Sequence, residues 1–390
     1  MVQLGVERLL ENKLAGLDEE RLGLITNPSG IDSELNTTID LLSEHEAFDV
    51  HKLFGPEHGI RGDAQAGVKV DDSIDEQTGL PVKSLYGEQR RLQPEMLEGL
   101  DTVIYDMQDV GCRFYTLIYT LAYALEGVAE AEKRLVVLDR PNPVAPLGVV
   151  GNRIEGTSGS FVGNYGLPIT HGMTVGELAE YFNEEFEIGA DLTVIEMRDW
   201  ERSDWYSETG LPWVYPSPNM PTLQTATIYP GTCLFEGTNL SEGRGTTRPF
   251  ELIGAPWISA EEWATELNAL DIEGVGFRPV HFTPTFSKHE RDTIEGVQVH
   301  VLDRDAVNPV VVGLTMLISA FSSSNECEWL EYDNEYFVDK LAGGEYLRSV
   351  ISDVDEEDSP REVAETVLDH WENERSGFEN IREQYLRYQE

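Results

Sequence analysis

The chain has 390 residues, which is longer than one hydrophobic core usually serves, so its length predicts two domains. Its 72 acidic residues outnumber its 28 basic residues and give a formal net charge of -44 at pH 7, while hydrophobic residues make up 40% of the sequence. This composition supplies a packed core but repels nucleic acid and anionic membrane surfaces, and we therefore exclude both as partners.

The first part of the chain alternates helices with strands, which is the order of a mostly parallel sheet with right-handed crossovers. Helical spacing of apolar residues, short β-branched runs and Gly/Pro turns predict the individual elements. The predicted helices cover residues 6–14, 35–46, 113–130 and 174–186, and the predicted strands cover residues 21–26, 48–54, 102–105, 135–138 and 192–197. We expect an α/β fold, with the mostly parallel sheet in a first domain over residues 1–232.

Residues 199–248 are rich in Trp, Tyr, Pro and Gly and are expected to be mostly loop. Flat aromatic rings beside amides and acids suit the faces of sugars. The alternative is a connector between domains whose aromatic rings simply pack. Beyond this stretch the elements predict a smaller α+β domain over residues 233–390. Its predicted helices cover residues 260–270 and 309–321 and begin again at Pro360, and its predicted strands cover residues 275–282 and 297–302.

Polar side chains follow four of the predicted strands, in the turn sequences NPSG, GPEHG, DMQDVG and DRPNP. Because the carboxyl ends of parallel strands meet at one edge of a sheet, these turns predict a charged crevice that binds a ligand. Each Asp or Asn taken alone can instead be a turn former or a helix cap. The residues expected at this crevice are Asn27, Glu57, His58, Arg61, Asp106, Asp109, Arg113, Asp139 and Arg140, with Arg153 from a glycine-bounded loop over residues 149–156.

The turn after the second strand is the place where we expect the chemistry. Glu57, His58, Arg61 and Asp63 all lie there, close to glycines and just past an apolar run. A solvated loop in which Glu57 caps the next turn is the alternative interpretation. Four ionisable residues in so short a segment favour a catalytic site.

Neither a disulfide framework nor a metal or organic cofactor is expected. Cys112, Cys233 and Cys327 lie far apart without CxxC spacing and are predicted to be buried thiols. The chain contains no GxGxxG, no GxxxxGK[ST] and no spacing typical of zinc or calcium ligands. The first residues lack the pattern of a signal peptide and no stretch reaches the length of a membrane span, so we expect a cytoplasmic protein.

Four motifs make the chain similar to the exo-β-N-acetylmuramidase family, formerly catalogued as a domain of unknown function. They are GPEHGIRGDAQAG from Gly55, DMQDVGCRFYT from Asp106, DRPNP from Asp139 and FEGTNLSEGRGT from Phe235. The resemblance implies a Rossmann-like catalytic domain without a nucleotide, a C-terminal auxiliary domain and an active site in the cleft between them. It also implies release of a terminal N-acetylmuramic acid, or a related N-acetylated or acidic sugar, from the non-reducing end of peptidoglycan glycan fragments.

The resemblance assigns the catalytic acid to Glu57 of the GPEHG motif. Glycoside hydrolysis usually needs a second carboxylate, although a 2-acetamido sugar can also attack with its own amide while a carboxylate orients it. Arginines pair with carboxylates in a bidentate manner and can bind the lactyl group of a muramic acid. The candidates for the second carboxylate are Asp106, Asp109, Glu236 and Glu242, and the further sugar-binding candidates are Arg61, Arg113, Arg153, Asn239 and Arg244.

Two other functions fit the same sequence. One is a non-catalytic sugar-binding protein, since a fold does not fix a function. The other is a phosphate- or nucleotide-handling Rossmann enzyme, which the missing glycine motifs disfavour. The sequence does not fix the oligomeric state.

The distribution of charge predicts a protein that needs high salt to stay folded. Acidic residues are interleaved with aromatic and aliphatic residues along the whole chain, and Arg greatly outnumbers Lys. Since the Debye length falls to about 3 Å at 1 M salt, molar salt screens the repulsion among the acids. We expect the melting temperature measured by scanning calorimetry to be clearly higher in molar KCl than in dilute buffer. Equal melting temperatures in the two solutions would contradict this.

Overall fold

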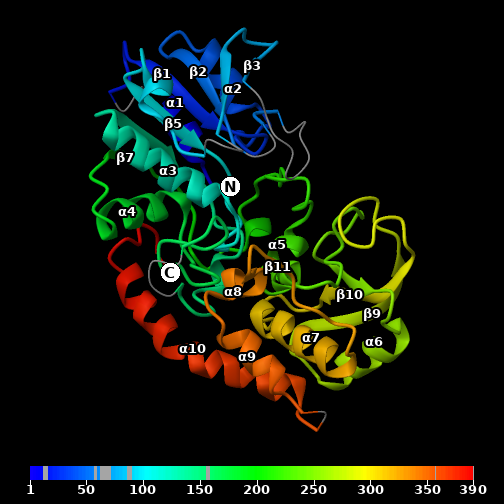
Figure 1. Ribbon diagram of the computed structural model, residues 1–390. Coiled ribbons are helices and arrows are strands. Elements are labelled where there is room, and N and C mark those ends of the chain that lie inside the picture. Colours follow the sequence, from blue (N-terminus) through cyan, green and yellow to red (C-terminus); the bar gives the residue numbers. More distant parts are fainter. Residues whose placement is uncertain are drawn as a thin grey trace.

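A seven-stranded sheet forms the centre of the first domain in the computed structural model (Figure 1). The strand order is β3-β4-β2-β1-β5-β6-β7, and every neighbouring pair is parallel except β3 with β4. The predicted mostly parallel α/β sheet is therefore confirmed. The strands are β1 (Arg21–Thr26), β2 (Asp49–Gly55), β3 (Ser73–Ile74), β4 (Pro81–Ser84), β5 (Thr102–Asp106), β6 (Arg134–Leu138) and β7 (Asp191–Ile195).

The structure describes most of the chain, but several segments lie outside the described part. Two of these segments bear on the predicted site, because one holds Glu57 and His58 and another holds Asp63. The described residues are 1–11, 16–56, 59–61, 72–85, 90–154, 159–355 and 357–389.

Helices connect the parallel strands, as the alternating sequence pattern predicts. One of them begins later than predicted, and another begins at the predicted cap. The helix expected from residue 113 begins at Leu117, because the four preceding residues form a turn in which Tyr115 N donates to Cys112 O. The helix expected at Thr174 has the predicted capping box, in which Thr174 and Glu177 bond each other's backbone N–H groups. The helices are α1 (Gly5–Glu11), α2 (Thr38–Glu44), α3 (Leu117–Glu130) and α4 (Val175–Glu185), with 3-10 turns at Pro94–Leu97, Ala145–Leu147 and Tyr206–Glu208.

The sequence analysis missed the two short strands β3 and β4, of which β3 is the edge strand of the sheet and β4 is its neighbour. Neither strand shows a clear alternation of apolar and polar residues, and Val82 is the one fully buried side chain among their residues. Short strands with exposed polar residues give little periodic signal, so pairing with β2 rather than local pattern defines β4.

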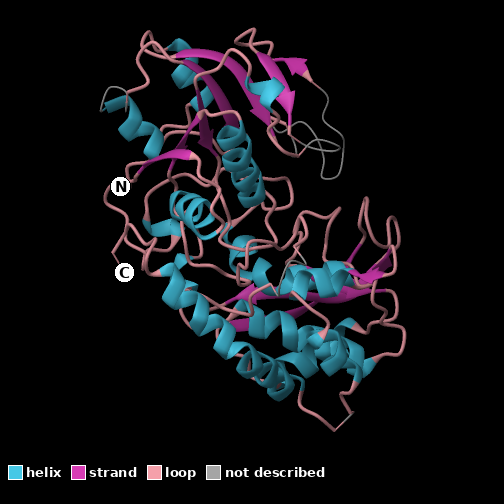
Figure 2. Ribbon diagram, turned by 60° about the vertical axis from the view of Figure 1, so that its left-hand side comes forward, coloured by secondary structure: helices cyan, strands magenta, loops and turns pink. Residues whose placement is uncertain are grey.

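The second domain is built on a three-stranded antiparallel sheet of order β8-β10-β9, covered by helices (Figure 2). This confirms the predicted smaller domain that mixes helices and strands. Its strands are β8 (Leu252–Ala255), β9 (Val275–Phe282), β10 (Ile294–Val301) and the hairpin β11 (Glu331–Tyr332) and β12 (Glu335–Tyr336). Its helices are α5 (Leu223–Thr232), α6 (Ala260–Ala269), α7 (Pro309–Ser323), α8 (Phe337–Ala342), α9 (Tyr346–Ser352) and α10 (Pro360–Arg382), with a 3-10 turn at Cys233–Gly237.

Helix α5 lies inside the stretch that the sequence analysis expected to be loop. It packs on α7 of the second domain, although the predicted boundary after residue 232 placed it in the first. Its propensity is weak, because it contains Pro230 and Gly231. Packing against α7 stabilises it instead, with Gly231 and Gly313 at the crossing. A Cβ atom on Gly231 would lie 1.8 Å from the backbone oxygen of Pro309, so only glycine allows the two helices to approach this closely.

Helix α10 joins the two domains. It packs along α7 and then reaches the first domain (Figure 1). There the ring of Phe378 meets Tyr181 of α4 edge to face at 5.6 Å. Apolar residues of both domains form one continuous buried cluster, which includes Val137 of β6, Val310 of α7 and Trp371 of α10. The relative position of the domains is therefore fixed by hydrophobic packing.

A pair of glycine substitutions tests the close crossing of α5 and α7. We expect Gly231→Ala to lower the free energy of unfolding by at least about 1–3 kcal/mol, because the new methyl group meets backbone atoms that cannot move aside. The measurement is equilibrium denaturation with guanidinium chloride.

The matched control is Gly377→Ala in α10, where a Cβ atom meets nothing within 4 Å. This variant should be as stable as the parent or more stable by about 0.5–1 kcal/mol, since alanine favours helix. Equal stability of the Gly231→Ala variant and the parent would show that the crossing is loose.

Candidate active site

The carboxyl ends of β1, β5 and β6 meet at one edge of the sheet. Thr26 of β1 is paired with Asp106 of β5, and Tyr105 of β5 is paired with Val137 of β6. The chain leaves β1 toward β2 and β4 on one side and returns through β5 toward β6 and β7 on the other. Ligands of open α/β sheets bind at such a reversal of strand order, so this edge is where a site is expected.

A hydrogen-bonded chain of polar groups runs along this reversal point. The backbone N–H of Gln108 donates to Ser29 Oγ at 3.0 Å, and Ser29 Oγ donates to Asn27 Oδ1 at 2.5 Å. Asn27 Nδ2 in turn donates to the carbonyl oxygen of Pro216 at 3.1 Å. Asn27 thus joins the end of β1 to the aromatic-rich loop that precedes α5.

Glu57 and His58, the residues expected to lie at the centre of the site, are outside the described residues. Their neighbours are described and follow the carboxyl end of β2, which lies beside β1. There the backbone N–H of Gly59 donates to the oxygen of Pro56 at 3.1 Å. The motif therefore begins at the same edge of the sheet as Asn27.

Asp109 lies just past β5 and forms a buried pair with His171. The backbone N–H of Met173 donates to His171 Nδ1, so Nε2 carries the proton in the neutral ring and faces Asp109 Oδ2 at 3.2 Å. Asp109 Oδ1 and Gln108 Oε1 are also buried, and neither has a hydrogen-bond partner within the described residues. Buried polar atoms of this kind normally bond to water or ligand, which keeps Asp109 among the candidates.

Asp106 and Arg140 form a buried ion pair, and neither is among the residues that line the cavity beside Glu236 described below. Asp106 is 0% exposed and accepts from Arg140 Nη2 at 2.9 Å, and the hydroxyl of Thr38 also bonds it. The same Arg140 nitrogen donates to the oxygen of Ile31 at 2.7 Å. We therefore remove both residues from the candidate site, because their charges neutralise each other inside the protein.

Arg113 and Arg153 also serve the structure rather than the crevice. Arg113 is fully buried and donates to the carbonyl oxygens of Leu167 and Leu341, and burial lowers its pKa to about 10. Arg153 Nε donates to the oxygen of Gly166 at 2.8 Å. Both side chains hold neighbouring loops together by these hydrogen bonds. We therefore remove both from the candidates for binding a substrate carboxylate.

Two further predicted residues, Arg61 and Asn239, are engaged elsewhere. Arg61 makes a bidentate pair with Asp75, and the hydrogen bonds from Arg61 hold the pKa of that carboxyl at about 2. Asn239 Nδ2 donates to the oxygen of Glu326 at 2.8 Å at an exposed position of the second domain. Neither side chain lines the cavity beside Glu236 described below.

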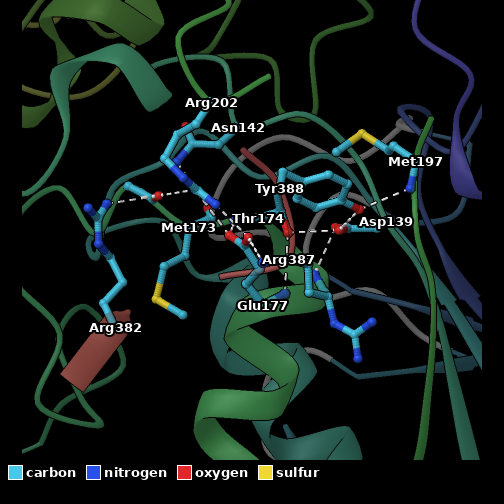
Figure 3. Close-up of polar contacts among 12 residues, drawn as sticks. Asp139, Asn142, Met173, Thr174, Glu177, Met197, Arg202, Arg382, Arg387 and Tyr388 are labelled. Atoms are coloured by element: carbon cyan, nitrogen blue, oxygen red, sulfur yellow. Dashed lines mark hydrogen bonds and ion pairs between the residues drawn. The ribbon is translucent and has the colours of Figure 1, made fainter. Parts of the chain in front are cut away.

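Asp139 is the centre of a different cluster, which binds the end of the chain (Figure 3). Its carboxylate accepts from Tyr388 Oη at 2.5 Å, Thr174 Oγ1 at 2.8 Å and Gly176 N at 2.8 Å. Burial raises its pKa from 3.8 to about 6 despite these donors. Asp139 therefore holds the C-terminal segment on the first domain, and we remove it from the substrate-binding set.

Glu236 and Arg244 face a small cavity between the two domains. Glu236 Oε1 accepts from Arg244 Nε at 2.8 Å and Nη2 at 2.6 Å, and the Glu236 side chain remains 19% exposed. Behind them Glu242 is buried and pairs with Lys288 Nζ at 2.8 Å. The cavity has a volume of about 110 Å³. Its lining residues are Phe114, Tyr115, Thr116, Leu117, Val162, Pro216, Ser217, Asn219, Tyr229, Glu236 and Arg244.

The aromatic-rich stretch combines both interpretations that the sequence left open. Trp200, Trp205 and Tyr206 pack in the interior, as a connector would. Pro216 and Asn219 instead line the cavity, as a ligand-binding loop would. Helix α5 and the 3-10 turn after it contribute Tyr229 and Glu236 to the same cavity.

Sequence reasoning missed His171 and Tyr388 completely. Each acts through a partner far away in sequence, Asp109 for His171 and Asp139 for Tyr388. No local sequence pattern around either residue predicts its pairing with that partner. Asn219 was noticed only as part of a sugar-suited loop.

Three further observations on the described residues concern membrane spans, metal sites and cysteines. No helix among them is both long and apolar enough to cross a membrane. No group of three or more His, Cys, Asp or Glu side chains in the described ranges is placed to hold a metal ion. Cys112 and Cys233 are buried free thiols, as predicted, whereas Cys327 is only half-buried.

The fold and the cavity together define a class of protein. A Rossmann-like domain without nucleotide-binding glycines meets a second domain at a cavity lined by carboxylate, amide and aromatic side chains, which are the groups that suit sugars. Acids placed beside such a cavity supply what glycoside hydrolysis requires, so the class that the fold and the cavity indicate is the glycoside hydrolases.

Comparison with known proteins leads to the family. Residues 22–224 match the family described as Exo-beta-N-acetylmuramidase NamZ, N-terminal, and residues 227–388 match Exo-beta-N-acetylmuramidase NamZ, C-terminal. Peptidoglycan beta-N-acetylmuramidase NamZ of Bacillus subtilis (strain 168) is 46% identical over 99% of this chain and 91% of its own length. The chain therefore belongs to the exo-β-N-acetylmuramidase NamZ family, as its motifs indicated, and is a glycoside hydrolase.

Solved structures of similar proteins support the same fold. A DUF1343 family protein from Bacteroides fragilis NCTC 9343 is 35% identical, with a TM-score of 0.88 over 100% of this chain and 99% of that one. A second DUF1343 family protein from the same organism is 29% identical, with a TM-score of 0.78 over 100% of this chain and 99% of that one. The two-domain arrangement thus recurs in its relatives.

The buried carboxyl of Asp139 predicts a pH-dependent stability. Its folded pKa of about 6 exceeds the ordinary value of 3.8, so the folded state binds more protons between these values and loses stability as pH rises through them. Asp139→Asn cannot titrate. We expect the free energy of unfolding of this variant, relative to the parent, to increase by up to about 3 kcal/mol between pH 4 and pH 7.

The measurement is urea denaturation of both proteins at several pH values and one fixed salt concentration. The comparison uses the change with pH, so a constant offset from altered hydrogen bonding does not matter. A stability difference that stays constant from pH 4 to pH 7 would mean that Asp139 titrates as in the unfolded chain.

Proposed function

We propose that this chain is an exo-acting enzyme that releases N-acetylmuramic acid, or a closely related N-acetylated acidic sugar, from the non-reducing end of peptidoglycan fragments. The observation that carries the proposal is the 46% identity to the B. subtilis peptidoglycan β-N-acetylmuramidase over nearly the whole of both chains. Turnover of 4-nitrophenyl β-N-acetylmuraminide tests it. Thermal stabilisation by the sugar without turnover would favour a sugar-binding protein instead.

We propose Glu57 as the proton donor. It belongs to the GPEHG motif, whose described flanks follow the carboxyl end of β2 at the edge of the sheet where ligands of this fold bind. A carboxylic acid at this edge can protonate the leaving oxygen of a glycosidic bond. His58 follows it directly in sequence and is proposed as a substrate ligand.

Glu236 is the proposed second carboxylate. Asp106 is neutralised by Arg140, and Glu242 is buried against Lys288. Asp109 is buried beside His171 and is kept as the alternative. Among these four carboxylates, Glu236 is the one that lines a described cavity, and Arg244 holds it there by two hydrogen-bonding nitrogens.

Replacement of Glu57 by Gln tests its role as the acid. The amide keeps the shape and the hydrogen-bonding reach but cannot give up a proton. We expect turnover of a natural disaccharide to fall by about 10²–10⁴-fold, because its alkoxide leaving group needs protonation. Turnover of an activated aryl glycoside should fall much less. The measurement is kcat and KM for both substrates.

The control is Glu46→Gln, which changes an exposed glutamate after α2 and should leave both rates unchanged. Equal slowing of both substrates with a raised KM would identify Glu57 as a positioning residue. Full activity of Glu57→Gln on the disaccharide would move the search to Glu236 and Asp109.

A further inference from the structure

The cavity beside Glu236 is too small for a whole sugar. Its volume of about 110 Å³ corresponds to roughly four water-sized groups at ~30 Å³ each. That is the size of one short substituent of a pyranose ring. The chemistry of the lining therefore decides which substituent fits.

One wall offers a hydrogen-bond donor that nothing else uses. Asn219 is only 6% exposed and lines the cavity, and its amide nitrogen has no hydrogen-bond partner among the described residues. Leaving a buried amide N–H unpaired costs stability. A ligand that brings a carbonyl oxygen to this point would satisfy it.

A second wall offers an acceptor. Glu236 Oε1 is occupied by Arg244, while Oε2 accepts only from the thiol of Cys233 at 3.4 Å among the described residues. A thiol is a weak donor, so Oε2 keeps the capacity to accept a hydrogen bond from an N–H group. Donor and acceptor thus come from two different domains to one small cavity.

The remaining walls are largely apolar and rigid. The ring of Tyr229 meets Phe114 and Tyr115 edge to face at 6.3 Å each, and it meets Phe250 at 4.7 Å. The guanidinium of Arg244 lies over the Phe250 ring at 5.1 Å, which fixes the arginine that holds Glu236. Rings locked in this way form a preformed contact surface for a methyl group.

We propose that this cavity receives the 2-acetamido group of the terminal sugar, with Asn219 donating to its carbonyl oxygen, Glu236 accepting from its N–H, and the aromatic walls contacting its methyl group. The inference rests on the proposed function for the identity of the sugar. It adds a specificity determinant, Asn219, and a role for Glu236 that acts through the acetamido group.

Ligand binding to the unaltered protein gives the first test. N-acetylmuramic acid is compared with 3-O-lactylglucose, which carries a hydroxyl in place of the acetamido group and has the same charge. We expect the N-acetylated sugar to bind at least about tenfold more tightly in calorimetric titrations, since it adds two hydrogen bonds and a buried methyl group. In saturation-transfer NMR its acetyl methyl should receive more magnetisation than its lactyl methyl. Equal affinities, or a stronger lactyl signal, would overturn the proposal.

Asn219→Leu gives the second test, because leucine has a similar size but no donor. We expect affinity for N-acetylmuramic acid to fall about tenfold, with little change for 3-O-lactylglucose. The melting temperature should not fall, since Asn219 Nδ2 has no partner to lose in the described structure. The control is Asn373→Leu at an exposed position of α10, which should change neither affinity. An unchanged preference in Asn219→Leu would exclude Asn219 as the determinant.

The two proposals fail in different ways. A protein that prefers the N-acetylated sugar but does not cleave 4-nitrophenyl β-N-acetylmuraminide has the acetamido site without the proposed activity. A protein that cleaves this substrate but binds both sugars equally has the activity without the acetamido site.

Discussion

The buried ion pair between Asp106 and Arg140 organises the edge of the sheet on which the site is built. Arg140 also bonds the oxygen of Ile31, so one guanidinium joins the segments that follow β1, β5 and β6. Removal of either charge would leave the other buried and unpaired, at a cost of about 3–5 kcal/mol. The groups that face the crevice, from Asn27 to Asp109, keep their places because this pair fixes the strand ends beneath them.

The same pair explains why the fold was predictable while much of the site was not. Apolar periodicity and turn residues identified five of the seven strands of the first domain, because each of these five is a local pattern. An Asp that follows a strand looks the same in sequence whether it faces a ligand or an arginine. Asp106 and Asp139 turned inward to partners, and Glu236 faces a cavity, yet nothing next to them in the chain distinguishes the three. Helix α5 was missed because packing of Gly231 on α7, not propensity, stabilises it.

Long-range contacts also connect the site to the end of the chain. Arg382 and Arg202 (Figure 3) both donate to the oxygen of Gly172, the residue after His171. His171 in turn faces Asp109. A Cβ atom on Gly172 would lie 2.3 Å from Arg382 Nη1, so glycine is needed for this contact. The last residue of α10 thereby braces a loop beside the buried pair of His171 and Asp109, although it contributes no side chain to the cavity beside Glu236.

The bonds of Asp139 set an order of events during synthesis. Its backbone oxygen accepts from Gly5 near the start of the chain, and its carboxylate accepts from Tyr388 near the end. A ribosome releases the strands of the first domain long before residue 388 leaves the exit tunnel. Until then a buried carboxyl lacks one of its donors and the loop beside it lacks its brace. The first domain therefore completes the bonds of Asp139 only after residue 388 has been made.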